Sequence, residues 1–188
     1  MKTQAIITLT ILSLTLASLA CTIFVGGPAY PENPIAVSTE AVGSLDDQFH
    51  AAATAAANSG TLNLTINESQ ITSLLANKLA EQTDPFITNP QVYLRNGQIQ
   101  MYGKVVRGNL QANVRIILSA TLDENGKPLI SILSADLGPL PAPEGLNSAI
   151  GQMVDQTFTG AIGPAAIGFR LESITIADGI MTLTGRVK

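Results

Sequence analysis

The chain of 188 residues has no tryptophan, one cysteine and one histidine. Zinc sites need several Cys or His ligands at close spacing, so we expect no metal site. The single histidine, His50, lies in an alanine-rich stretch beside Phe49, which is typical of a packing or surface position. No nucleophile elbow, phosphate-binding loop or dinucleotide fingerprint occurs. We therefore expect a protein that is not an enzyme and that uses no cofactor.

Charge is also scarce. Charged residues make up 13% of the chain, about half the usual share, and aromatic residues 4%. Such a composition indicates either an unusually compact domain or an apolar surface that faces a ligand, a partner or a bilayer. The net charge of -4 argues against nucleic acid as a partner. The densest basic group favours a solvated face, with a patch for anionic lipid head groups as the alternative; it comprises Arg95, Lys104, Arg107 and Arg115.

The N-terminus has the layout of a secretory signal over residues 1–20: a basic start, an apolar run and small residues at the end. Cys21 follows directly, which predicts a bacterial lipoprotein acylated at this residue. The sequence Ser18-Leu19-Ala20-Cys21 lacks the usual leucine three residues before the cysteine. The alternatives are cleavage elsewhere or an uncleaved anchor, although the apolar run is shorter than the roughly 20 residues of a spanning helix.

Residues 21–43 are rich in glycine and proline without apolar periodicity, which predicts a lipid-anchored flexible tether. Residues 44–188 alternate between helical and strand patterns and predict a single α+β domain. Its expected elements are helices over 44–58, 67–82 and 144–159, hairpins over 92–105 and 169–187, and strands over 61–66, 110–118 and 129–137. The apolar run 116–118 indicates either a bulge or burial of both strand faces. The pattern favours a curved antiparallel sheet packed on two or three amphipathic helices.

The two predicted hairpins match each other. Residues Val92, Leu94, Asn96, Gly97, Ile99, Met101, Gly103, Lys104 and Val105 align with Ile174, Ile176, Asp178, Gly179, Met181, Leu183, Gly185, Arg186 and Val187. Turn chemistry alone makes any two such hairpins alike. The glycine six residues beyond each turn glycine is not required by hairpin geometry, however. We therefore expect an internal helix–hairpin repeat.

The order of motifs resembles that of a known group of proteins. These motifs are Thr65-Ile66-Asn67-Glu68-Ser69-Gln70-Ile71 followed by Leu74-Leu75, then Val92-Tyr93-Leu94-Arg95-Asn96-Gly97-Gln98-Ile99, then Leu137-Gly138-Pro139-Leu140-Pro141. The chain from 61 to 188 resembles small bacterial extracytoplasmic lipoproteins related to the tubular lipid-binding (TULIP, or BPI-like) superfamily. The resemblance implies a curved sheet around helices with an apolar groove for acyl chains. This chain is shorter, which favours a shallow groove over a full tube.

Low charge, the apolar helix stripes and the resemblance together predict the lining of that groove. The expected ligand-lining residues are Ile71, Leu74, Leu75, Ile150, Met153 and Phe158. Each of them is alternatively a plain core residue. We expect a binding protein for lipid or another apolar ligand, held outside the cytoplasm on the bacterial cell membrane. The alternative is an adaptor domain of the cell envelope that docks another protein and has no small ligand.

Overall fold

The computed structural model describes residues 22–140, 148, 151–152 and 169–188. Within these residues the chain forms two helices and eight strands, an α+β architecture as the sequence predicts. The elements are β1 (Ile23–Phe24), α2 (Thr39–Ser59), β2 (Thr61–Asn67), α3 (Glu68–Ala80), β3 (Thr88–Arg95), β4 (Gln98–Arg107), β5 (Leu110–Leu122), β6 (Pro128–Asp136), β7 (Phe169–Ala177) and β8 (Ile180–Val187). Cys21 and most of the predicted helix over 144–159 lie outside the described residues.

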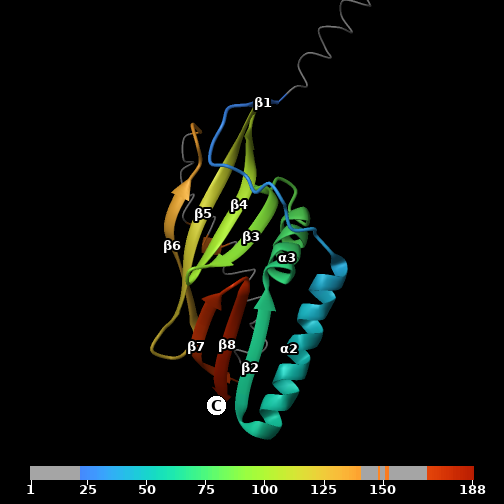
Figure 1. Ribbon diagram of the computed structural model, residues 1–188, viewed down its shortest axis with the longest axis vertical. Coiled ribbons are helices and arrows are strands. Elements are labelled where there is room, and N and C mark those ends of the chain that lie inside the picture. The colour runs from blue at the N-terminus through green and yellow to red at the C-terminus, as the bar shows by residue number, and fades with distance from the viewer. Residues whose placement is uncertain (1–21, 141–147, 149–150, 153–168) are drawn as a thin grey trace, which may run out of the picture.

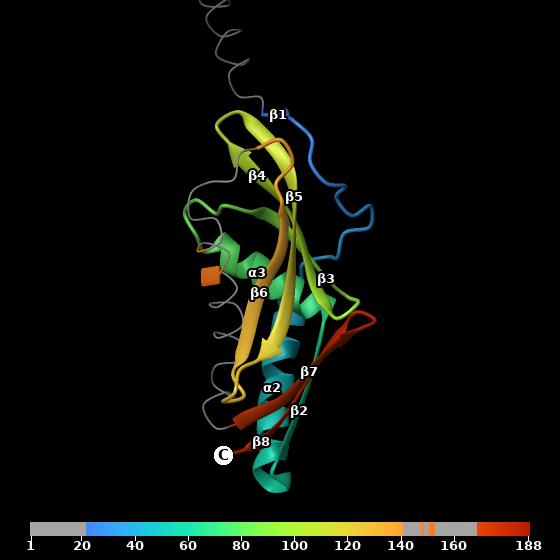
Figure 2. The same cartoon turned by 90° about the vertical axis from the view of Figure 1, so that its left-hand side faces the viewer.

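The strands form two sheets that follow each other along the long axis of the molecule (Figure 1). One sheet has the order β1-β5-β4-β3, with β6 also paired to β5, and the other has the order β2-β8-β7. All described pairings are antiparallel except that of β1 with β5. The sheets are strongly curled, as the second view shows (Figure 2). Helix α2 packs along β2, and α3 packs against β3 and α2, so both helices support the curved sheets.

Alternating residues of the strands build the core. Strand β2 alternates between exposed and buried positions along its whole length, and Leu62, Leu64 and Ile66 are its buried side chains. The run 116–118 contains no bulge: β5 alternates there between buried and half-buried side chains and pairs with β4 without a shift. The pairing with β6 does shift register at this place, but the extra residue, Leu133, lies on β6. Helix α3 begins where the sequence predicts, with a capping box in which Asn67 and Gln70 each accept a hydrogen bond from the other's backbone N–H.

The predicted start of the first helix at Ser44 is wrong. Helix α2 begins at Thr39, and the Ser38 hydroxyl oxygen accepts hydrogen bonds from the N–H groups of Glu40 and Ala41. Gly43 lies inside the helix, where a glycine costs only about 1 kcal/mol relative to alanine and does not end it. The Ser44 hydroxyl instead accepts a hydrogen bond from the Gln70 amide of α3.

Residues 22–38, which we call the N-terminal strap, run along the sheet instead of hanging free. Ile23 and Val25 donate backbone hydrogen bonds to β5 and to the turn before it, and Gly26 accepts one from Asn113. Gly27 lies so close to Asn113 that a Cβ atom would collide with its carbonyl group. This differs from the flexible tether expected over 21–43, because Gly27 serves close backbone contact and residues 39–43 belong to α2.

The turns of the two hairpins join the sheets. Both turns have positive φ at each central residue, as their type requires: Asn96 and Gly97 in one, Asp178 and Gly179 in the other. Gly97 N–H donates to the carbonyl oxygen of Ile176, and Gly179 N–H donates to that of Leu94. The two turns therefore contact each other through a reciprocal pair of hydrogen bonds.

Candidate functional site

A pocket of about 530 Å³ lies between the N-terminal strap, the end of α3 and the beginning of β3. Its volume is within the usual range for small-molecule sites. Nine of its thirteen lining residues are apolar or aromatic: Tyr30, Pro34 and Val37 from the strap, Ala76, Leu79 and Ala80 from α3, and Pro85, Ile87 and Pro90 from the approach to β3 and its start. The polar lining consists of Thr88, Asn89, Gln91 and Lys104. The pocket thus has apolar walls and one cationic side chain.

Lys104 and Tyr30 are neighbours in the pocket lining. The Lys104 ammonium lies 5.5 Å from the centre of the Tyr30 ring, within the range of a cation–π contact. The Tyr30 hydroxyl donates a 2.8 Å hydrogen bond to the carbonyl oxygen of Asn89. Burial, and to a lesser degree the nearby Tyr93, raise the pKa of Tyr30 above its usual value of 10.0, so the phenol is neutral at physiological pH. Lys104 is therefore the group in the pocket that attracts an anion.

The strap forms one wall of the pocket, and buried side-chain amide and hydroxyl groups bind its backbone in place. Gln91, which is 5% exposed, accepts a 2.6 Å hydrogen bond from Ile35 N–H and donates a 3.2 Å one to the Ile35 carbonyl oxygen. Ser38 N–H donates to the hydroxyl oxygen of Ser73 on α3. These contacts explain why polar residues on α3 and β3 are buried: the strap covers them and satisfies their hydrogen bonds.

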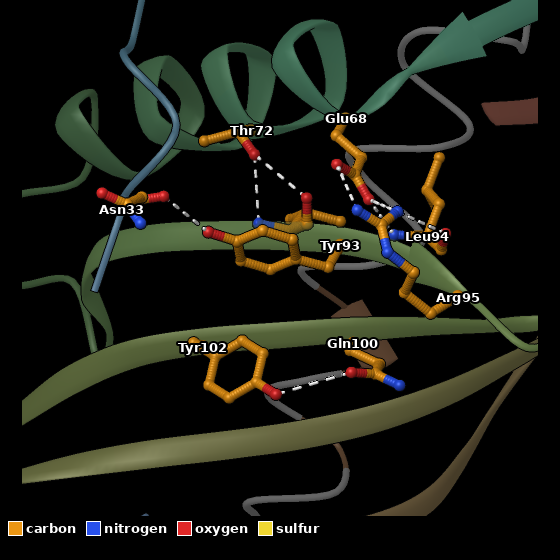
Figure 3. A network of polar contacts seen from close by, with 9 residues as sticks. Asn33, Glu68, Thr72, Tyr93, Leu94, Arg95, Gln100 and Tyr102 are labelled. Atoms are coloured by element: carbon orange, nitrogen blue, oxygen red, sulfur yellow. Dashed lines mark hydrogen bonds and ion pairs between the residues drawn. The ribbon is translucent and has the colours of Figure 1, made fainter. Parts of the chain in front are cut away.

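A second polar network ties α3 to β3 beside the pocket (Figure 3). The Thr72 hydroxyl accepts a hydrogen bond from Val92 N–H and donates one to the Val92 carbonyl oxygen. The Glu68 carboxylate accepts a 2.7 Å hydrogen bond from Leu94 N–H and pairs with the Arg95 guanidinium. The helix that forms one wall of the pocket is therefore fixed to the strand that forms another.

The structure places the predicted ligand-lining residues differently from the pocket. Ile71 and Leu75 are buried in the core, and Leu74 is partly buried against it; none of the three lines the pocket. They lie on α3, and Leu79, one turn beyond Leu75, does line it. The other three expected residues, Ile150, Met153 and Phe158, lie outside the described residues.

Sequence reasoning did not find the strap side of the pocket. Tyr30 lies between Pro28 and Pro31 in a segment without apolar periodicity. An aromatic residue at such a position was the one feature of the sequence that could have indicated a buried contact. The basic residues of β3 and β4 have separate contacts: Arg95 with Glu68, Lys104 with Tyr30, and Arg107 with Phe86 at 5.1 Å. Arg115 on β5 is partly buried, and its Nε has no hydrogen-bond partner among the described residues.

Comparison with known protein families and with curated proteins finds no match for this chain. Among the residues that the structure describes, no helix is long and apolar enough to cross a membrane. Within the same residues, no group of three side chains suited to a metal ion lies together. The pocket is therefore the feature from which a function has to be argued.

Proposed function

We propose that this protein is a membrane-tethered, extracytoplasmic binding protein for a lipid or another apolar ligand, and that the pocket under the strap is its binding site. The observation that carries this proposal is the combination of apolar walls with Lys104 in the lining. Apolar lining with a few placed polar groups is typical of small-molecule sites. The ligand that fits best is amphipathic: an acyl chain or similar apolar body with an anionic head beside the Lys104 ammonium.

The location follows from the N-terminus. The signal-like run over residues 1–20 followed by Cys21 favours export and acylation of the cysteine. The resemblance to small lipoproteins related to the tubular lipid-binding superfamily points to the same class. Acyl chains contribute about 0.8 kcal/mol for each buried CH₂ group, so a multiply acylated Cys21 holds the domain firmly at a membrane.

The internal repeat belongs to the same proposal. It is supported by the reciprocal hydrogen bonds, because Leu94 and Gly97 of one hairpin align with Ile176 and Gly179 of the other. It is also supported by the glycines beyond each turn. A Cβ atom on Gly103 would collide first with the Ile87 side chain, and one on Gly185 would collide with the carbonyl oxygen of Arg170 on the paired strand. Both aligned positions are thus too crowded for a side chain, although by different groups.

A binding titration tests the ligand proposal. Protein produced from residue 22 onward should bind a fluorescent fatty acid saturably. Lys104→Met keeps the stem of the side chain but removes its charge, and should weaken binding roughly tenfold, the size of one charge-assisted contact. Lys78→Met is the matched control, because Lys78 lies exposed on α3 outside the pocket lining and pairs with Glu81.

Two outcomes would count against the proposal. If the folded wild-type protein binds no member of several lipid classes, the alternative of an adaptor domain that docks another protein takes its place. If Lys104→Met and Lys78→Met weaken binding equally, the ligand does not place its head group at Lys104. Circular dichroism of each variant separates a lost contact from a lost fold.

A further inference from the structure

Large hydrophobic side chains are exposed at one end of the molecule. Among the described residues nine such side chains are exposed, and four of them gather at the tip where β1 joins the β4–β5 turn: Ile23 (60%), Phe24 (57%), Val106 (43%) and Leu110 (40%). The pairing of β1 with β5 sets Ile23 beside Leu110. Monomeric soluble proteins rarely expose such side chains in groups, and an exposed group marks an interaction site.

The apolar side chains stand on both faces of this tip. Successive side chains of a strand point to opposite faces of a sheet, and paired residues share a face. Leu110 lies two and four positions before the buried residues Ala112 and Val114, so its side chain points to the core side of the sheet. Its partner Ile23 points to the same side. Phe24 and Val106 both pair with Gln111, which points away from the core, so the side chains of Phe24 and Val106 lie on the outer side of the sheet. A lipid bilayer that surrounds the tip would bury the apolar side chains on both faces, whereas a protein with a flat surface would bury those on one face.

Arg107 is the charged residue of the β4–β5 turn, and neither this turn nor residues 22–31 contain Asp or Glu. Farther along β5, Arg115 is paired in register with Asp136 of β6. Arg107 is exposed directly beside Val106. Arginine next to apolar side chains is suited to an interface, where its stem lies among acyl chains and its guanidinium meets anionic head groups.

The chain also enters the fold at this tip. Ile23 follows Cys21 by two residues, so a lipid on Cys21 starts within about 8 Å of the tip backbone. The hydrogen bonds of Ile23 and Val25 to the β4–β5 turn and β5 remove the slack that a flexible tether would give. The anchor and the exposed apolar cluster are therefore brought to the same surface.

From these observations we infer that the tip formed by Ile23, Phe24, Val106, Arg107 and Leu110 inserts into the head-group region of an anionic lipid bilayer. The molecule then stands on the membrane with its C-terminus at the far end (Figure 1). This inference rests on the membrane tether of the proposed function, but it is independent of the ligand in the pocket. With the tip inserted, the domain has a fixed orientation on the membrane and does not diffuse at the end of a flexible linker.

The absence of tryptophan allows a direct test. Val106→Trp in the full chain places one fluorophore in the tip yet far from Cys21 in sequence, so proximity to the anchor along the chain does not explain its signal. Val187→Trp is the matched control, since Val187 is similarly exposed, at 45%, and lies at the opposite end. Each protein is reconstituted into vesicles of phosphatidylcholine and phosphatidylglycerol, with and without brominated acyl chains.

We expect brominated lipid to quench the Val106→Trp protein by about half or more, because an interfacial apolar group lies at the acyl boundary, and to leave the emission of Val187→Trp nearly unchanged. Leu110→Trp provides a second reporter if the first variant is misfolded.

Equal emission from Val106→Trp with and without bromine, in protein that sediments with the vesicles, would overturn the inference and leave the tether intact. Equal quenching of the tip variant and the control would overturn it as well. Cys21→Ser protein whose mature mass matches that of the wild type apart from the substituted atom would instead contradict the acyl anchor.

Discussion

Glu68 is the residue on which the junction between α3 and the two hairpins depends. It opens α3, its carboxylate accepts from Leu94 N–H and pairs with Arg95, and its own N–H donates to the Gly179 carbonyl oxygen. Its side chain is 16% exposed, so water competes little for these contacts. One helix-start residue therefore links a helix and both turns.

Glu68→Ala should lower the free energy of unfolding by about 2–3 kcal/mol, because it leaves a buried N–H and a guanidinium without their acceptor. Glu68→Gln keeps an acceptor oxygen and should cost less. Urea unfolding followed by circular dichroism measures both. Glu81→Ala is the control, since it removes an exposed pair with Lys78 at the end of the same helix and should cost under about 1 kcal/mol. A loss for Glu68→Ala no larger than for Glu81→Ala would show that the junction does not depend on this carboxylate.

At the scale of the element, the glycine six residues beyond each hairpin-turn glycine permits the close approach of a neighbouring segment. Strand β8 carries Gly185 opposite the register shift in β7 between Leu171 and Ser173, and β4 carries Gly103 opposite the shift in β3 between Thr88 and Gln91. The backbone of β7 fills the space of a side chain at Gly185, and the Ile87 side chain, just before β3, fills it at Gly103. The glycines are thus a consequence of the irregular pairing.

Gly185→Ala should destabilise the protein by about 1–3 kcal/mol, because the new Cβ would lie 2.6 Å from the Arg170 carbonyl oxygen, a backbone atom that cannot turn away. Gly43→Ala should stabilise it by about 0.5–1 kcal/mol, since Gly43 is helical and no atom lies within 4 Å of its added Cβ. Thermal unfolding of the two single variants shows whether the effects have opposite signs. Equal shifts would contradict the crowding at Gly185.

Local signals in the sequence predicted most of these elements. The helix start at Asn67 and the Asn96-Gly97 turn both depend on neighbouring residues, and the structure confirms each. The predicted start of α2 at Ser44 was wrong because the N-cap is Ser38, whose own N–H is held by the Ser73 hydroxyl of another helix. Local preference identifies candidates, and tertiary contact selects one.

At the scale of the whole molecule, the strap decides whether the pocket exists. Its hydrogen bonds to the rest of the fold join residues that are 35 or more positions apart, such as Ile35 with Gln91 and Pro28 with Asn113. No periodicity or spacing in the sequence encodes such pairs. For that reason the pocket, including Tyr30 and Lys104, was not predictable, whereas the apolar stripe of α3 that supplies Leu79 was.

Gln91→Ala should release the strap around Ile35 while the sheets stay folded, because it removes both hydrogen bonds that hold the Ile35 backbone. We expect a loss of about 1–3 kcal/mol and faster amide hydrogen exchange in peptides covering residues 30–38. Binding of a fluorescent fatty acid should weaken in parallel. Gln48→Ala is the control, since the Gln48 amide contacts only a surface hydroxyl on its own helix. Unchanged exchange in the strap would contradict the closure described here.

The distant contacts of the strap also set an order of events during folding. Residues 22–38 are synthesised before every partner they touch, and Asn113 emerges 85 residues after Pro28. Closing long loops is slow, so the strap docks only after α3, β3 and β5 have assembled. In the export proposed above, the N-terminal segment would therefore remain accessible to processing and acylation while the rest of the domain folds. Docking of the strap then completes the pocket, and in the same late step it would bring the tip to the proposed membrane surface.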